Sequence, residues 1–254
     1  MFSKLTEEDF DVLRGPLESG RQSPANLGPI LILSIFLQAL LFALVYFMTA
    51  PYTIYPYKAE ILNVYVWSTF ILVALCLLYA IPAVYKRSGK IQYLISILVT
   101  QNMSSIPFLL MALFLLGKDG RGMIADPESL LTFTYILLFI GFLVFAATCI
   151  RFYILLRKGH YRKGSKKGEL RNKFEVNSYI PSAIIAGTGL VFIIQYIVRI
   201  SAIDNVDEAI LIVGGVLTFF VMLFILPEQL VILYCKIRYK SFNFNVRGYL
   251  NGKD

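Results

Sequence analysis

Six long apolar segments divide the chain, and they constrain its fold more than any other feature. Each contains about 20 residues or more, the length that an α-helix needs to cross the hydrocarbon core of a bilayer. Within hydrocarbon the backbone has to satisfy its own hydrogen bonds, so such a segment is expected to be helical. The sequence therefore predicts an all-α, polytopic integral membrane protein with six transmembrane helices, at about 27–48, 61–85, 91–116, 130–156, 180–200 and 209–235.

The composition supports this class. Apolar residues make up 57% of the chain and charged residues 16%, whereas soluble domains are about 45–50% apolar and about 25% charged. Much of the apolar surface therefore has to face lipid. The three cysteines show no CxxC pair and no metal-ligand spacing, so neither a metal site nor a cofactor is expected.

Basic residues gather in the loops that a six-span topology places on one side of the membrane. They lie in residues 86–90, 157–173 and 236–240, and they explain the net charge of +8 without a nucleic-acid partner. By the positive-inside rule, both termini are predicted to be cytoplasmic in a cell-membrane protein. Residues 236–254 then form a basic cytoplasmic tail.

The longest basic loop offers a surface to anionic molecules. Anionic lipid head groups and a protein partner are the two contacts that we consider for it. The candidate residues are Arg157, Lys158, Arg162, Lys163, Lys166 and Lys167.

Residues 1–26 form a polar cytoplasmic segment with one short amphipathic helix. Thr6 and Asp9 have the spacing of a capping box at its start. Three apolar residues then share one face: Phe10, Leu13 and Leu17. We expect this helix to rest on the membrane surface, and the alternative is that it docks a soluble partner. The acidic excess of the segment also offers a partner to the basic loop.

Two spans carry polar residues near the middle of the bilayer. Gln101 and Asn102 lie about 15 Å along the third span, and Gln38 lies at a similar depth in the first. Amides at this depth need partners, so hydrogen bonding between helices is the favoured interpretation, and a polar substrate pathway is the alternative. The candidate residues are Gln38, Gln101, Asn102, Ser104 and Ser105.

The last span contains a proline followed by a carboxylate. A helix over 209–235 would be about 40 Å long, longer than the roughly 30 Å core. Pro227 cannot donate a backbone hydrogen bond, so we expect a break there, with a second helix running along the membrane surface. Glu228 then lies near the cytoplasmic boundary. Pro227 and Glu228 are a candidate hinge, and Arg151 is the candidate ion-pair partner of Glu228.

Signatures of catalysis are absent from the sequence. It contains no His-Glu-x-x-His, no Gly-x-Ser-x-Gly and no Walker A motif, and the predicted spans contain no aspartate. Its one histidine, His160, lies in a loop. A non-enzymatic role is therefore expected.

The plan of 254 residues, six spans and two cytoplasmic ends resembles several small bacterial membrane families. These include permease subunits of ABC exporters and polytopic immunity proteins against peptide toxins. The resemblance implies a membrane component of a transport, export or toxin-resistance system, acting with a separate ATPase or another membrane subunit. Residues 86–90 form a shorter loop than a permease would use for its ATPase. The alternatives are a self-contained secondary transporter and, third, a membrane enzyme acting on lipid.

Overall fold

The computed structural model describes residues 5–119, 126–165, 169 and 206–252. Throughout these residues the regular structure is helical, without a β-strand, as predicted. Five of the described helical segments are long and apolar enough to cross a membrane. They correspond to five of the six predicted spans; the remaining one, residues 180–200, lies outside the described part.

The first and third spanning segments are each assembled from shorter pieces, the second is the single helix α3 followed by a separate short helix, and prolines lie at several of the junctions. A proline removes one backbone donor, and it fits best in the first turn of a helix. Pro82 opens the short helix after the second span, and Pro107 lies in the first turn of α6, just after the interruption at Ser105. In chain order the pieces are α2 (Pro24–Ala43), the π-helical η2 (Leu44–Thr49), η3 (Ala50–Tyr52), α3 (Lys58–Ala80), α4 (Pro82–Tyr85), α5 (Gly89–Ser104) and α6 (Ile106–Leu116).

The last two described spans are single long helices, α7 (Pro127–Arg157) and α10 (Val206–Arg238). The expected break at Pro227 is not present, because α10 continues through this residue to Arg238. Its last turns carry the buried side chains of Val231, Ile232 and Cys235. These side chains belong to an apolar cluster with the N-terminal segment and the end of α7. That packing holds the turns after Pro227 in a helix even though one backbone hydrogen bond is missing.

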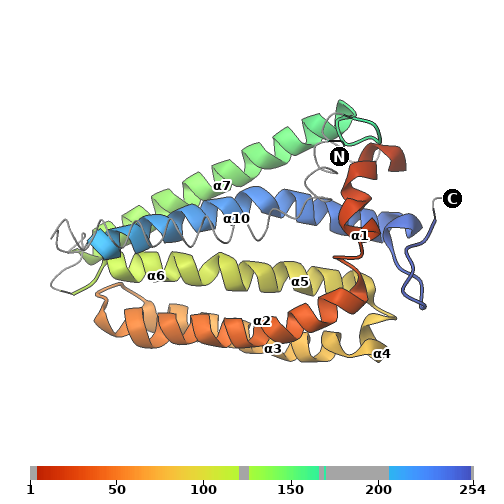
Figure 1. Cartoon of the computed structure of the whole chain (residues 1–254). Helices are drawn as coiled ribbons and strands as arrows, with labels where there is room; N and C mark the ends of the chain where they lie inside the picture. Colours follow the sequence, from red (N-terminus) through yellow and green to blue (C-terminus); the bar gives the residue numbers. More distant parts are fainter. Residues whose placement is uncertain (1–4, 120–125, 166–168, 170–205, 253–254) are drawn as a thin grey trace.

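The long helices lie roughly side by side. In Figure 1, α2 and α3 lie at one edge of the bundle, α7 lies at the other, and α5, α6 and α10 lie between them. Both ends of the described chain are at the same end of the bundle, together with α4 and the end of α7. We call this the basic end. The opposite end holds an ion pair between Lys118 and Glu208.

Glycines bring α10 close to its neighbours. A Cβ atom built on Gly215 would lie 2.5 Å from the backbone oxygen of Phe108 in α6. A Cβ atom on Gly141 of α7 would lie 3.0 Å from the side chains of Phe219 and Leu223 in α10. Small residues allow this backbone approach, which strengthens dispersion contacts between helices in a membrane. The same residues leave no room for larger side chains.

The N-terminal segment folds onto the helices. It contains η1 (Glu7–Arg14) and α1 (Gly15–Glu18), and its capping box is present: the Thr6 N–H donates to Asp9 Oδ2 over 2.9 Å. The predicted apolar face does not rest on the membrane surface. Phe10, Leu13 and Leu17 are at most 1% exposed, because they pack against α7, α10 and the tail.

Candidate functional site

The polar residues predicted at mid-span meet in one buried cluster between α2, α3 and α5. The Asn102 amide Nδ2 donates to Gln38 Oε1 over 2.9 Å and to Thr69 Oγ1 over 3.2 Å. Gln38 is fully buried, and the other two are at most 7% exposed. Gln38 Nε2 in turn donates to the backbone oxygen of Ser34 over 3.3 Å. Three helices are therefore joined by neutral hydrogen bonds, as the packing interpretation expects.

The remaining candidates of the midplane set do not join this cluster. No hydrogen bond among the described residues links the side chains of Gln101, Ser104 or Ser105 to Asn102. Ser105 is buried where α5 gives way to α6, and Gln101 Nε2 is a buried donor without an acceptor. Of the five candidate residues, Gln38 and Asn102 join the cluster, and Thr69, its third member, was not among the candidates. Thr69 lies about one helical turn from the middle of the second predicted span, and this depth could have identified it as a partner of the amides.

The ion-pair candidates lie beside each other. Arg151 and Glu228 both line a cavity of about 320 Å³ between α7 and α10, together with Thr148 and Phe224. The Arg151 guanidinium carbon lies 5.9 Å from the centre of the Phe224 ring, within the range of a cation–π contact. Pro227 is buried in α10. The structure therefore brings a cation and a carboxylate from two spans to one cavity near the basic end.

The basic loop after α7 pairs with the acidic N-terminal segment, as the sequence indicated. Arg162 Nε lies 2.7 Å from Asp9 Oδ1, and the Val12 N–H donates to the Tyr161 carbonyl oxygen over 2.9 Å. Burial alone raises the pKa of the Asp9 carboxyl, but hydrogen bonds from Arg162 and Thr6 outweigh it, and the net pKa is lowered. The hydrogen bond to Asp9 likewise raises the pKa of Arg162.

The other described cations of this loop face outward. Arg157, Lys158 and Lys163 are exposed, and the Arg157 guanidinium carbon lies 6.0 Å from the centre of the Tyr153 ring. Lys166 and Lys167 lie outside the described residues. Three of the six candidates therefore remain on the surface, while Arg162 is used to hold the N-terminal segment.

The C-terminal tail is folded, which its polar composition did not indicate. Phe242 is fully buried, and the guanidinium carbon of Arg14 lies 5.9 Å from its ring centre. The Asn243 amide donates to the backbone oxygens of Lys236 and Tyr239 over 2.7 and 2.8 Å. Aromatic residues in an otherwise polar tail were the signal for this docking. We call residues 5–23, 158–165 and 239–252 together the cap.

The described residues contain no group of three histidine, cysteine, aspartate or glutamate side chains that could hold a metal ion. No protein-family model, no curated protein and no solved structure matches the chain. Function therefore has to be argued from the two regions above, the amide cluster within the bundle and the charged basic end.

Proposed function

We propose that the chain is a six-span protein of the cell membrane with both termini in the cytoplasm. Support comes from the direction of the helices. Helix α7 ends at the basic end, and α10 begins at the opposite end (Figure 1). Six spans produce this arrangement together with two chain ends on one side, and five spans do not. The basic residues at that end favour the cytoplasmic side by the positive-inside rule.

We further propose that it is a non-enzymatic component of a transport, export or toxin-resistance system and works with a partner protein. The cap is the observation that carries this proposal. Helix α10 contains 33 residues, which corresponds to about 50 Å, against roughly 30 Å for the hydrocarbon core. The end of α10 and the cap packed on it therefore extend beyond the bilayer as a folded platform.

The outward face of this platform suits an acidic partner. Arg157 is the last residue of α7, Lys158 and Lys163 lie in the loop that follows, and all three side chains are exposed. Surface charges of one sign steer a partner of the opposite sign and add to its specificity more than to its affinity. A separate ATPase or another membrane subunit with an acidic docking surface fits this chemistry.

A partner that binds here will be lost when the charge is reversed. We expect the K158E/K163E variant to co-purify with at least tenfold less partner from native membranes, and K158R/K163R to retain it because the charge is unchanged. Both variants change exposed side chains and should fold. Substrate transport by the purified protein alone in liposomes would overturn the proposal.

One observation favours a second candidate, the self-contained secondary transporter. Arg151 and Glu228 line a cavity together near the ends of two spans, and ionisable residues in spans often mark an ion or proton route. The liposome measurement separates the two candidates. Transport that is lost in Glu228→Gln would establish the transporter.

A further inference from the structure

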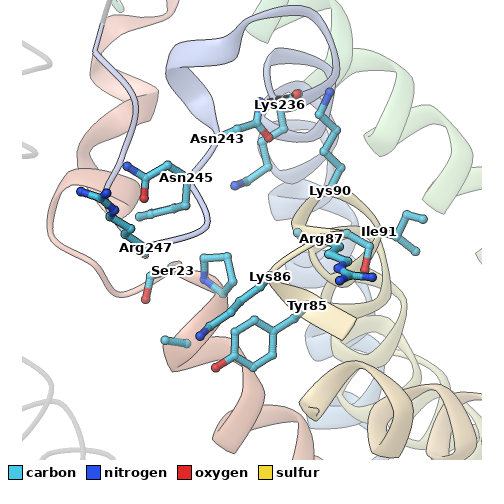
Figure 2. Close-up of a pocket in the computed structure, with 16 residues that line it drawn as sticks. Ser23, Tyr85, Lys86, Arg87, Lys90, Ile91, Lys236, Asn243, Asn245 and Arg247 are labelled. Atoms are coloured by element: carbon cyan, nitrogen blue, oxygen red, sulfur yellow. Dashed lines mark hydrogen bonds between the residues drawn. The ribbon is translucent and has the colours of Figure 1, made fainter. Parts of the chain in front are cut away.

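A second cavity, of about 410 Å³, lies at the basic end (Figure 2). Its walls come from the start of α2, the turn between α4 and α5, the last turn of α10 and the tail. No carboxylate is among its lining residues, but five basic residues are: Lys86, Arg87, Lys90, Lys236 and Arg247. Figure 2 shows these side chains arranged around the cavity from separate segments of the chain.

Lys236 is a buried cation at this cavity. It is 2% exposed, and its ammonium donates to the Phe242 carbonyl oxygen over 3.2 Å. The ammonium also lies 5.1 Å and 5.4 Å from the ring centres of Tyr93 and Phe244. None of the ion pairs within the described residues includes it. A buried charge is costly without a counter-charge, so an anion in the cavity would stabilise Lys236.

Two helix N-termini add positive potential to the same cavity. Helix α2 begins at Pro24 with Ser23 as its cap, and α5 begins at Gly89; the first residues of both line the cavity. Backbone N–H groups and the helix dipole favour an anion at such ends. Both dipoles and all five side chains therefore have the sign that attracts an anion.

An apolar stripe leads away from the cavity along α5. Ile91 lines the cavity and is 48% exposed, and Leu94 and Leu98 follow at helical spacing with exposures of 38% and 45%. Side chains three and four residues apart lie on one face of a helix. A molecule with an anionic head in the cavity could therefore lay an acyl chain along this face.

We propose that this cavity binds the phosphate of an anionic phospholipid in the leaflet at the basic end. The five cations hold the head group, Lys236 supplies its deepest contact, and the α5 stripe contacts an acyl chain. This site differs from the exposed cations after α7, and it does not depend on a partner protein.

The proposal can be tested by counting lipids bound to the full-length protein in mild detergent, using native mass spectrometry. The probes are phosphatidylglycerol, phosphatidylcholine and inorganic phosphate. The K86Q/R87Q/K90Q variant removes three cations whose side chains lie mainly at the surface, and the control, R157Q/K158Q/K163Q, removes three exposed cations from the end of α7 and the loop after it. Each lysine or arginine near an anionic lipid surface contributes roughly fivefold to affinity, so we expect about tenfold to a hundredfold weaker phosphatidylglycerol binding in the cavity variant alone.

Three outcomes would overturn the assignment. Equal losses in both variants would mean that general charge attracts the lipid, and equal binding of phosphatidylcholine would mean that no anionic head group is selected. Displacement of the lipid by millimolar inorganic phosphate would assign the cavity to a free anion. If the triple variant fails to fold, the single variants K86Q and K90Q, measured in the same way, should each bind phosphatidylglycerol about fivefold more weakly.

Discussion

The middle of the bundle and its basic end differ in whether their polar side chains are charged and in whether they have partners. In the middle, Gln38, Thr69 and Asn102 are neutral and buried, and they form hydrogen bonds with one another. At the basic end the described cations outnumber the carboxylates, and Lys236 is buried without a carboxylate partner among the described residues. Polar groups within the spans are therefore matched to one another, whereas the basic end presents cations without matching carboxylates, as the two proposals for that end require.

The two regions also differ in how they are assembled. The amide cluster lies within the membrane-spanning segments, and its residues come from α2, α3 and α5. The basic end is built from both ends of the chain, which meet through contacts such as the hydrogen bond from the Ser241 hydroxyl to Glu7. A substitution in the bundle should therefore affect helix association, and one in the cap should release the chain ends first.

The largest effect is expected from removing the central side chain of the cap. Phe10 is fully buried against α7, α10 and the tail, so Phe10→Ala leaves a cavity that costs about 3–5 kcal/mol. Limited proteolysis should then cleave the N-terminal segment much faster than in the wild type. Val246→Ala, at a residue that is 71% exposed, is the control. Unchanged proteolysis in Phe10→Ala would mean that the cap is not held by this packing.

A smaller effect is expected where α10 touches α6. In Gly215→Ala the new Cβ would meet the Phe108 backbone oxygen at 2.5 Å, whereas nothing lies within 4 Å of the Cβ in Gly214→Ala. Overpacking of this kind costs about 1–3 kcal/mol, and alanine at an open helical position is neutral or slightly stabilising. The thermal unfolding midpoint in detergent measures the stability of both variants. Equal midpoints for the two variants would show that the bundle can separate at this contact without cost.

Most of the bundle could be predicted from the sequence. An apolar run long enough to cross the bilayer has to form a helix, because its backbone has to satisfy its own hydrogen bonds there. The depth of Gln38 and Asn102 along their spans was enough to predict that amides would pair between helices. The course of the chain after Pro227 could not be predicted locally, because Val231 and Ile232 hold it through contacts with distant segments. The cavity at the basic end could not be predicted from the sequence either, because it forms only when the folded tail brings Arg247 close to residues 86–90.

Asn102 in the amide cluster and Gln101, its neighbour outside the cluster, form a matched pair of positions. Asn102→Leu removes the donor to Gln38 and Thr69 and leaves their oxygens buried, which costs about 0.5–2 kcal/mol between membrane helices. Gln101→Leu removes a buried donor that has no acceptor, so its stability should be unchanged or slightly higher. The measurement is the unfolding midpoint together with activity. Normal stability with lost activity in Asn102→Leu would indicate that the cluster forms a polar pathway rather than a packing contact.

The smallest effect is expected from the ion pair that ties the basic loop to the N-terminal segment. The pKa of Asp9 is lowered in the folded protein, because hydrogen bonds from Arg162 and Thr6 outweigh its burial. A lowered carboxyl pKa stabilises the fold above the unfolded pKa, near 4, and this contribution is lost as the pH falls through the folded pKa.

The wild-type protein should therefore lose cap stability on acidification below about pH 4, and Asp9→Asn should lose less because it already lacks the charge. Protection of the N-terminal segment from proteolysis by an acid protease, measured between pH 6 and pH 3, reports this difference. Glu8→Gln, at an exposed position in the same turn, should behave like the wild type. Because Arg162 is 58% exposed, water and salt screen the pair, and its effect should be well below that of Phe10→Ala. An identical pH profile in the wild type and Asp9→Asn would show that this ion pair does not stabilise the cap. The apolar packing around Phe10 would then account for the stability of the cap.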